Sequence, residues 1–296
     1  MIIGFIGLGH MGNPMAQHLL KNGFKLYVYD VVPHSVETMV LAGATSVRSV
    51  ADIAEMCDVV FTSVQNTQQV IEICLAENGL FSHAKKNLLY IDCSSIDVNE
   101  TRQLHQEAEK REIAMLDAPV SGGVGGAIAG SLTFMVGGTN EHFQRAQPIL
   151  AMMGKKIIHA GQAGNGQAAK ICNNLLLGVS MIGVAEAFTL ANKLGLDQKK
   201  FFEISSNSSG QCWSMTVNCP VPGILDHAPS NHDFQPGFMA KMMLKDLQLA
   251  HHAAESVGIS VPLGSVAAEL YRLYVNQGFG ERDFSGIINL INPLQK

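Results

Sequence analysis

The sequence predicts two domains: an α/β domain with a mostly parallel, doubly wound sheet over residues 1–162, and an all-helical domain over residues 163–296. Short apolar strand patterns alternate with amphipathic helical patterns as far as Gly161, which indicates βαβ units and a parallel sheet. From Gly166 onward the periodicity is helical, with no convincing strand. The change in pattern therefore places the domain boundary between residues 160 and 166.

The first domain is expected to begin with a strand, a helix and a second strand. The predicted strands cover residues 2–6, 25–29, 59–63, 88–91, 114–116, 133–136 and 156–159. Helices are predicted between several of them, over residues 11–21, 98–110 and 141–152. Strands and helices of these lengths in alternation are typical of a sheet covered by helices on both faces.

The second domain is expected to begin with a long buried helix. Its apolar run covers residues 171–191 but includes Asn173, Asn174 and Glu186, which a membrane span of about 20 residues would have to bury in lipid. A helix of a soluble protein is therefore the better interpretation. Gly195 is expected to end the helix, and residues 218–237, rich in Pro and Gly, are expected to form an irregular loop.

Composition and charge exclude several functional classes. The 296 residues are 47% hydrophobic and 15% charged, so the chain can bury large cores. A net charge of -5 gives no electrostatic basis for binding nucleic acid or an anionic membrane. Six scattered cysteines without a C-x-x-C pair predict reduced thiols, in the cytoplasm or, if a transit peptide is missing from this chain, in the mitochondrial matrix. Eleven histidines show no H-E-x-x-H spacing, so no metal site is predicted.

The stretch "GLGHMG", directly after the first strand, predicts a cradle for the phosphates of a dinucleotide. It consists of Gly7, Leu8, Gly9, His10, Met11 and Gly12. In G-x-G-x-x-G spacing, the first glycine permits a tight turn, the second admits a pyrophosphate, and the third allows close packing of helix on strand. A plain glycine turn is the alternative, and the position between the first strand and the first helix makes it the weaker one.

Asp30 follows the second predicted strand, 18 residues after Gly12. A carboxylate at this position hydrogen-bonds the hydroxyls of the adenosine ribose. It would repel a 2′-phosphate, and the following "VVPHS" supplies no Arg or Lys to neutralise that charge. The sequence therefore predicts NAD rather than NADP as the cofactor.

The stretch "DAPVSGGVGGAIAG" follows the strand predicted at residues 114–116, at the edge of the sheet where ligands gather. Ser121 offers a hydroxyl group, and Gly122 and Gly123 can present unobstructed N–H groups. Together these groups could hold a small carboxylate. A flexible glycine loop without a ligand remains the alternative.

Lys170, Asn173 and Asn174 lie three and four residues apart, so they are neighbours on one helix. The structural alternative is a lysine that caps the helix start, with amides bonded to nearby backbone. Apolar surroundings argue against it, because an unpartnered ammonium or carboxamide is costly to bury. A pocket that gives these groups a substrate would offset that cost.

Further polar and aromatic positions are ambiguous when taken singly. Lys245 stands beside Asp246 in "MLKDLQLA", which is ordinarily a solvated helix face. Trp213, the only tryptophan, and Phe238 flank the predicted loop. Aromatic residues there are as often core anchors as pocket walls.

Taken together, these stretches resemble the β-hydroxyacid dehydrogenase family over almost the whole chain. The resemblance rests on "GFIGLGHMGNPMA", "DAPVSGGVGGA", "GNGQAAKICNN", "SSGQCW", "PVPG" and "KDLQLA". It implies a Rossmann domain, a long interdomain helix and a helical domain that mediates assembly into a homo-oligomer, either a dimer or a tetramer.

The resemblance also implies roles for individual residues. Lys170 would be the catalytic acid/base, with Asn174 orienting the substrate beside it. Ser121, Gly122 and Gly123 would hold the substrate carboxylate, and Trp213 and Phe238 would form the substrate-side wall. The positions expected to line the NAD site are Val64, Gln65, Gln69, Ser95 and, on the nicotinamide side, Lys245. The family commonly has "LP" where this chain has Val64 and Gln65, so the contacts of that loop are expected to differ.

The implied reaction is NAD-dependent oxidation of a small hydroxyacid at a primary alcohol, with 3-hydroxyisobutyrate and methylmalonate semialdehyde of valine catabolism as the expected pair. Lys170 could serve as the base only if its pKa falls from about 10.4 toward neutrality, through burial and a nearby cation. Reduction of tartronate or succinic semialdehyde is the alternative within the family. A catalytically silent NAD-binding protein is the alternative outside it.

Overall fold

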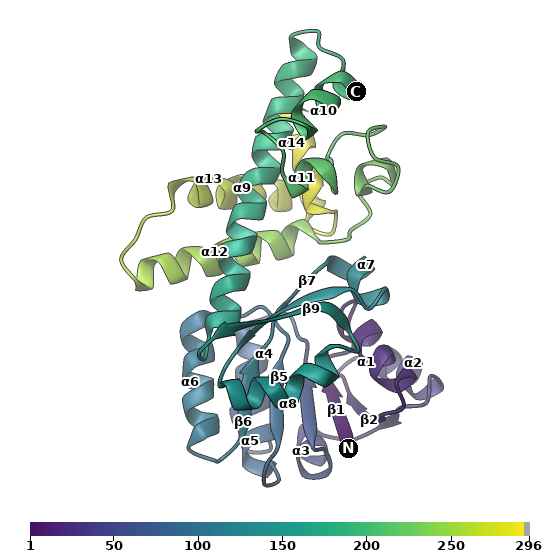
Figure 1. The fold of residues 1–296 in the computed structure, drawn as a ribbon, viewed down its shortest axis with the longest axis vertical. Helices are drawn as coiled ribbons and strands as arrows, with labels where there is room; N and C mark the ends of the chain where they lie inside the picture. Colours follow the sequence, from purple (N-terminus) through teal and green to yellow (C-terminus); the bar gives the residue numbers. More distant parts are fainter. Residues whose placement is uncertain (293–296) are drawn as a thin grey trace. The chain divides into compact units, whose positions relative to one another are not determined.

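The computed structural model describes residues 1–292 and divides into two compact units, Met1–Lys170 and Ile171–Lys296. The division falls inside helix α9 (Asn165–Lys193), a few residues after the boundary expected between residues 162 and 163. By length and composition alone, α9 is apolar enough to cross a membrane, and 44% of its most apolar window is buried within the protein. The first unit contains the sheet, and the second consists of helices and loops (Figure 1).

Unit 1 is built on a nine-stranded sheet whose core is parallel. The parallel strands are β1 (Ile2–Ile6), β2 (Lys25–Tyr29), β3 (Thr45–Ser46), β4 (Val59–Thr62), β5 (Leu89–Asp92) and β6 (Ala114–Asp117), in the spatial order β3-β2-β1-β4-β5-β6. The chain starts at β1, winds to β2 and β3, and then crosses back to β4 on the other side of β1. This reversal creates a switch point at the carboxyl ends of β1 and β4, where α/β sheets bind ligands.

The sheet continues past β6 with a change of direction. Strand β8 (Leu132–Gly137) runs antiparallel to β6, β7 (Val120–Ser121) pairs antiparallel with β8, and β9 (Gly154–Gly161) pairs parallel with β8. The expected mostly parallel sheet is confirmed, whereas the two-residue strands β3 and β7 were not anticipated. Strands this short carry too few residues to show an alternating pattern.

Two hydrophobic cores cover the two faces of this sheet. On one face the core includes side chains from α1 (Gly12–Lys21), α2 (Pro33–Leu41), α7 (Gly123–Ile128) and α8 (Asn140–Leu150). On the other face it includes side chains from α3 (Val50–Met56), α4 (Thr67–Leu75), α5 (Leu80–His83) and α6 (Val98–Glu109). Helices on both faces explain why β1 and β4 are apolar almost throughout, since neither face meets water.

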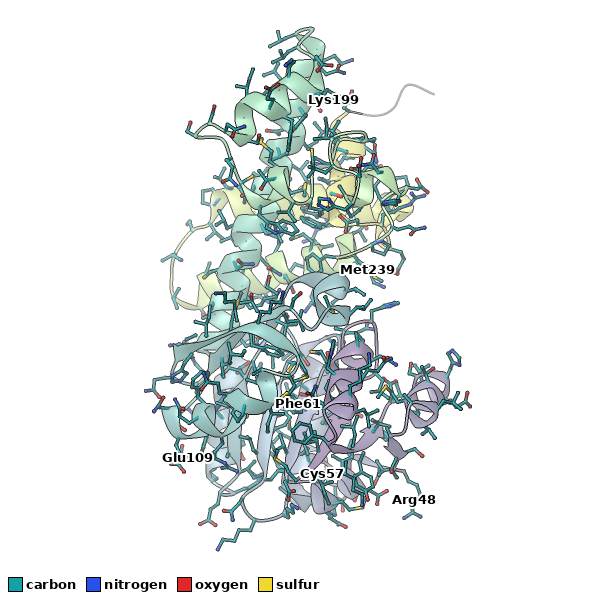
Figure 2. All side chains as sticks on the ribbon, turned by 45° about the vertical axis from the view of Figure 1, so that its right-hand side comes forward. Arg48, Cys57, Phe61, Glu109, Lys199 and Met239 are labelled. Atoms are coloured by element: carbon teal, nitrogen blue, oxygen red, sulfur yellow. The ribbon has the colours of Figure 1, made fainter. Side chains whose placement is uncertain are left out.

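The sheet interior is tightly packed around aromatic side chains. Phe5 on β1 and Phe61 on β4 are fully buried, with their ring centroids 5.7 Å apart in a stacked arrangement. In Figure 2, Phe61 lies in the interior of unit 1, whereas the side chains of Arg48 and Glu109 lie at its surface. Phe5 and Phe61 are also register partners in the parallel pair of β1 with β4, so this contact packs the two strands whose carboxyl ends form the switch point.

Unit 2 is helical, and residues 171–292 contain no strand beyond one isolated bridge between Met239 and Asp283. After α9 come α10 (Gln198–Ser206), α11 (Trp213–Thr216), α12 (Ala240–Ser256), α13 (Pro262–Tyr274) and α14 (Ile288–Ile291), with shorter turns at Pro229–Asn231, Val275–Phe279 and Phe284–Ile287. One core joins α9, α12 and α13, and a second joins α9 to α11 and the loop after it. The all-helical second domain is therefore confirmed, and the predicted loop at 218–237 contains only the turn Pro229–Asn231.

Candidate active site

The glycine turn after β1 has the geometry of a phosphate cradle. Gly7 has φ +92°, and a Cβ atom there would overlap the carbonyl oxygen of Ser63. A Cβ atom on Gly12 would overlap the carbonyl oxygen of Gly7, so helix α1 can start this close to β1 only with a glycine. Gly9 differs, because a Cβ atom there would have no protein atom within 4 Å. The protein itself therefore does not require a glycine at Gly9, and the open space beside it suits a ligand.

Asp30 lies just after β2 and is tied to this turn. Its Oδ2 accepts a hydrogen bond of 2.6 Å from the backbone N–H of Leu8, and its Oδ1 accepts one of 2.8 Å from Val32. His10 is exposed and Met11 is half-buried at the start of α1. The carboxylate expected to bind a ribose is thus held against the middle of the glycine turn by the turn's own backbone.

The loops after β4 and β5 lie beside this turn, because β4 and β5 follow β1 in the sheet. The N–H of Val64 donates to Ser94 Oγ at 3.0 Å, which links the two loops. The N–H of Gln65 donates to Gln69 Oε1 at 2.9 Å, which closes the loop onto the start of α4. Ser95 follows Ser94 directly. The structure therefore gathers all the cofactor positions predicted in unit 1 at one edge of the sheet, and Lys245 lies in unit 2.

The serine–glycine stretch is more ordered than a free loop. Ser121 belongs to β7, where it pairs with Thr133 of β8, and Gly122 and Gly123 have φ +133° and +62° at the start of α7. The other end of α7 is held by His18 of α1, whose Nε2 lies 3.0 Å from the carbonyl oxygens of both Ala127 and Ile128. The proposed carboxylate cradle is thus braced against the helix that begins at the phosphate cradle.

Lys170 lies in the second turn of α9 and is only 8% exposed. The first turn of the helix is fixed by Asp117, the last residue of β6. Asp117 is fully buried and accepts hydrogen bonds from the N–H groups of Gly164 and Gln167, each at 2.9 Å. His105 Nε2 lies 2.9 Å from the same carboxylate. A strand-end carboxylate therefore holds the start of the helix that carries Lys170.

A second buried carboxylate stands one strand away. Asp92, at the end of β5, is fully buried, and its Oδ1 accepts hydrogen bonds from Thr62 Oγ1 at 2.7 Å and the N–H of Ser94 at 3.0 Å. Burial raises the pKa of the Asp92 carboxyl to about 6, against the lowering effect of these bonds, and the neighbouring Asp117 adds to the rise. Among the described residues, Asp92 Oδ2 has no hydrogen-bond partner.

In unit 2, Asn174 is held by protein groups at both ends of its carboxamide. Its Nδ2 donates to Asp246 Oδ2 at 2.5 Å, and its Oδ1 accepts from Asn173 Nδ2 at 3.0 Å. Lys245 Nζ lies 3.1 Å from Asp246 Oδ1, and Asp246 is only 2% exposed. The Lys–Asp pair of α12 is therefore not a solvated face, because its carboxylate is buried against α9.

The two aromatic candidates have different surroundings. Trp213 begins α11 and is 49% exposed, so its indole can reach a ligand. Phe238 packs edge-to-face on Phe284, with ring centroids 5.7 Å apart, and is half-buried beside the core of unit 2. Phe238 therefore packs against the core of unit 2, which is the core-anchor role that the sequence left open beside the role of a pocket wall.

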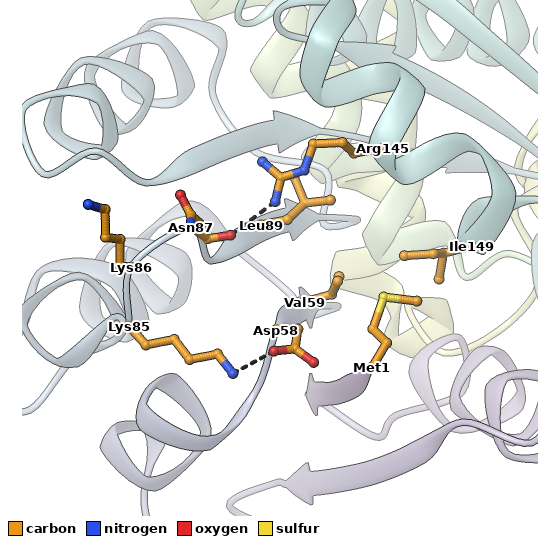
Figure 3. Close-up of a pocket in the computed structure, with 9 residues that line it drawn as sticks. All are labelled: Met1, Asp58, Val59, Lys85, Lys86, Asn87, Leu89, Arg145 and Ile149. Carbon is orange, nitrogen blue, oxygen red and sulfur yellow. Dashed lines mark hydrogen bonds and ion pairs between the residues drawn. The ribbon is translucent and has the colours of Figure 1, made fainter.

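A cavity of about 520 Å³ opens at the opposite, amino ends of β1, β4 and β5 (Figure 3). Two of its charged groups pair with each other, since Lys85 Nζ lies 2.5 Å from Asp58 Oδ1, and Arg145 Nη2 donates to the Asn87 carbonyl oxygen at 3.0 Å. None of the predicted site residues lines it. This cavity is therefore separate from the candidate active site.

Sequence reasoning left Asp92, Asp117, Gln167 and Asp246 out of the site. For the first two, a signal was available, since "IDCSS" and "LDAPVS" each place an aspartate at the end of a predicted strand. Asp246 and Gln167 gave no such signal, because their burial depends on contacts distant in sequence. In residues 1–292, no group of three or more His, Cys, Asp or Glu side chains could hold a metal ion.

Comparison with known proteins finds matches for both parts of the chain. Residues 2–161 match a sequence family described as the NAD-binding domain of 6-phosphogluconate dehydrogenase, and residues 164–291 match one described as "NAD-binding of NADP-dependent 3-hydroxyisobutyrate dehydrogenase". The NAD-dependent L-serine dehydrogenase of Pseudomonas aeruginosa is 48% identical over 99% of this chain and 98% of its own. The mitochondrial 3-hydroxyisobutyrate dehydrogenase of Homo sapiens is 45% identical over 98% of this chain and 86% of its own.

Among solved structures, a 3-hydroxyisobutyrate dehydrogenase of Mycobacterium tuberculosis studied with L-serine is 41% identical, with a TM-score of 0.93 over 99% of this chain and all of that one. The fold, the glycine turn and these similarities define a nicotinamide-dependent dehydrogenase of small hydroxyacids. Within that class, the chain belongs to the 3-hydroxyisobutyrate dehydrogenase family.

Proposed function

We propose that this protein oxidises 3-hydroxyisobutyrate to methylmalonate semialdehyde with NAD, as in valine catabolism, and that Lys170 is the general acid/base. The observation that carries the proposal is the place of Lys170. It is an ammonium-bearing side chain only 8% exposed, in the second turn of a helix that a buried carboxylate anchors to the carboxyl edge of the sheet. A general acid/base has to be shielded from bulk water at the edge of the sheet where ligands bind, and Lys170 meets both conditions.

Each end of the substrate has groups that suit it. The hydroxyl of Ser121 and the N–H groups of Gly122 and Gly123 would bind the carboxylate. Both glycines have positive φ angles, and because they have no side chains, a ligand can approach their N–H groups closely. Asn174, one helical turn after Lys170 on α9, has a second N–H besides the one that binds Asp246. That N–H would donate to the substrate hydroxyl oxygen and hold it for Lys170.

The proposed reaction needs one proton transfer and one hydride transfer. When bound, NAD accepts the hydride from the primary alcohol carbon. Neutral Lys170 Nζ takes the hydroxyl proton as the C–O bond becomes a carbonyl, and it returns the proton in the reverse reaction. Burial of Lys170 keeps bulk water away from this proton path.

NAD is proposed over NADP because of Asp30. Its carboxylate is oriented by Leu8 and Val32, and the exposed residues that follow, Val31 and Val32, carry no cation. The residues proposed to bind the cofactor are Gly7, Leu8, Gly9, His10, Met11, Gly12, Asp30, Val64, Gln65, Gln69, Ser95 and Lys245. We also propose that the protein works in the cytoplasm, where free thiols such as these six stay reduced.

L-serine is the second candidate substrate, favoured by the relative that is 48% identical and named for it. Serine and 3-hydroxyisobutyrate share a primary alcohol and a carboxylate, and they differ at the central carbon, where serine bears an ammonium and 3-hydroxyisobutyrate a methyl group. An ammonium needs a carboxylate or carbonyl acceptor, whereas a methyl needs an apolar wall. The wall formed by Trp213 and Phe238 would favour the methyl group.

The test is a substrate panel with purified protein and either NAD or NADP, read by reduced-cofactor absorbance. The substrates are 3-hydroxyisobutyrate, L-serine, 3-hydroxypropionate, glycerate and 4-hydroxybutyrate. We expect the highest kcat/KM with 3-hydroxyisobutyrate and NAD. A higher value with L-serine would transfer the assignment to the second candidate, and no turnover with any of them would indicate a silent NAD-binding protein.

Lys170→Ala should lower kcat by roughly 10²–10⁴-fold while leaving NAD binding within a few-fold of the unmodified protein. Lys170→Arg is the matched control, because it keeps the positive charge but cannot release a proton near neutral pH. Near-normal turnover in either variant would remove Lys170 from the acid/base role.

We also propose that the protein is a homo-oligomer, a dimer or tetramer, assembled through the exposed face of α9. Leu176, Gly183 and Leu190 stand seven residues apart on this helix and are all exposed, with the leucines 68% and 61% exposed. An identical apolar stripe on a second copy would make a self-complementary contact, and the glycine would let two helices approach closely. Leu190→Glu should lower the mass measured by light scattering, whereas Leu263→Glu, an exposed leucine on α13, should not.

A further inference from the structure

Gln167 links the loop at Ser94–Ile96 to the start of α9. The proposed reaction depends on the position of these two parts of unit 1 relative to each other. Gln167 is fully buried in the first turn of α9. Its Nε2 donates to the carbonyl oxygen of Ser94 at 2.7 Å, and its Oε1 accepts from the N–H of Ile96 at 3.2 Å. The carboxamide of Gln167 therefore forms hydrogen bonds with the backbone on both sides of Ser95. Ser95 is proposed to line the cofactor site.

The backbone of Gln167 is held as firmly as its side chain. Its N–H donates to Asp117 Oδ2 at 2.9 Å, so the side chain cannot move without disturbing the anchored end of α9. The Asp117 carboxylate is itself confined between two glycines. A Cβ atom on Gly137 would lie 2.5 Å from Asp117 Oδ1, and one on Gly166 would lie 2.8 Å from Oδ2.

Lys170 follows Gln167 by three residues, so both side chains lie on neighbouring positions of one helix face. The loop at Ser94–Ile96 and the first two turns of α9 are thus joined directly by hydrogen bonds. The Val64 N–H, which donates to Ser94 Oγ, extends this connection to the second cofactor loop. A shift of the cofactor loops would be transmitted through Gln167 to the helix that carries Lys170.

We propose that Gln167 is a positioning residue that sets the place of Lys170 relative to the bound nicotinamide cofactor. The inference rests on the proposed role of Lys170 as acid/base. Gln167 touches neither substrate nor cofactor in this scheme, and it acts through Ser94, Ile96 and Asp117. Its importance follows from geometry, because a misplacement of about 1 Å between a catalytic group and its substrate can cost on the order of 10²-fold in rate.

The decisive variant is Gln167→Glu, compared with Gln167→Met. Glutamate can still accept from Ile96, but its ionised carboxylate faces the Ser94 carbonyl with no hydrogen to donate. Protonated glutamic acid can donate to that carbonyl and restore the bond. We therefore expect kcat of Gln167→Glu to be lowered at alkaline pH and to recover toward the unmodified enzyme on acidification, whereas Gln167→Met is lowered about 10- to 100-fold at every pH.

Gln162→Met is the control, since Gln162 is exposed and precedes α9. Circular dichroism and thermal melting establish that each variant is folded, and tryptophan fluorescence measures NAD affinity without turnover. A pH profile for Gln167→Glu that is parallel to the unmodified enzyme would overturn the proposal, even if Gln167→Met failed to fold. So would a kcat of Gln167→Met within twofold of normal.

Failure of the proposed function can be told apart from failure of this inference. If Lys170→Ala stays active, Lys170 is not the acid/base, and a positioning role toward it is excluded. If Lys170→Ala is inactive while both Gln167 variants are normal in kcat and pH profile, the proposed function stands and the inference about Gln167 fails.

Discussion

Asn174 Nδ2 donates a hydrogen bond of 2.5 Å to Asp246 Oδ2, and both side chains are buried in unit 2. The bond joins α9 to α12, and together with the bond from Asn173 it fixes which way the carboxamide of Asn174 points. An asparagine held in this way can present its remaining N–H in a single direction. The position of that N–H is therefore determined by the helical unit before any substrate binds.

Asn174→Asp should destabilise the protein at neutral pH by roughly 3 kcal/mol, because it places two carboxylates in contact inside the protein. One of them would have to take up a proton, so stability should recover as the pH is lowered toward about 5. Thermal melting at several pH values measures this. Asn173→Asp is the matched control, because Asn173 is exposed, and an equal loss in both variants would contradict a special role for the Asn174–Asp246 contact.

Substitutions in the glycine turn should separate folding from cofactor binding. Gly9→Ala leaves the fold intact, since its Cβ meets no protein atom within 4 Å, but fills space proposed for the pyrophosphate. We expect an unchanged melting temperature and at least a tenfold weaker affinity for NAD, measured by fluorescence titration. Gly12→Ala should lower the melting temperature, because its Cβ overlaps the carbonyl oxygen of Gly7. Equal thermal stability in the two variants would contradict this account of the turn.

Cofactor preference should change on replacing Asp30 and adding a cation beside it. Val31 is 81% exposed, so Val31→Arg can be accommodated and can reach a 2′-phosphate. The double variant Asp30→Ala/Val31→Arg should raise the ratio of kcat/KM for NADP over NAD by about 10- to 100-fold, as expected for one charge-assisted contact. Val31→Arg alone should change it less, because Asp30 still repels the phosphate. A native enzyme that used both cofactors equally would refute the role assigned to Asp30.

The pH dependence of stability should carry the signature of Asp92. Its folded-state pKa of about 6 lies above the ordinary value of 3.8, so the folded state holds the proton more tightly than the unfolded state. The contribution of Asp92 to stability should therefore fall as pH rises from about 4 to about 6, by on the order of 3 kcal/mol. Asp92→Asn keeps an oxygen for Thr62 and Ser94 and should remove this slope.

Denaturant unfolding at several pH values in that range measures the effect. The change of the unfolding free energy with pH is a better readout than its absolute value, because the amide introduced by Asp92→Asn also changes the hydrogen bonding at this position. Asp58→Asn is the contrasting control. A hydrogen bond from Lys85 lowers the pKa of the Asp58 carboxyl, so Asp58 contributes stability that is lost as pH falls. An unchanged slope in Asp92→Asn would contradict the assignment.

The sequence was most informative where local patterns determine structure. Alternating strands and helices predicted the doubly wound sheet, and the glycine spacing predicted a turn whose steric requirements are visible at Gly7 and Gly12. The loss of strand patterns after Gly161 predicted the helical second unit. These features depend on neighbours in sequence, so they can be read without knowing the tertiary fold.

Contacts between distant segments could not be predicted in the same way. Asp117 meets Gly164 and Gln167 some 50 residues later, and Asp246 meets Asn174 across 72 positions. In the sequence, the pair Lys245–Asp246 resembles an exposed helix face. The Asp246 carboxylate is buried only because α12 packs on α9. Burial is a property of the folded chain, so neither the burial of Asp246 nor the hydrogen bonds of Asp117 to α9 could be predicted from local patterns.

The anchoring of α9 by Asp117 has a consequence for dividing the molecule into fragments. A first unit cut at residue 161, where the first family match ends, would lose the N–H groups of Gly164 and Gln167 and leave the Asp117 carboxylate with only His105. A fragment that extends to Lys170 keeps those donors and the grip of Gln167 on the loop at Ser94–Ile96. A fragment designed to keep the carboxyl edge of the sheet intact therefore has to include the start of the helix that carries the proposed catalytic lysine.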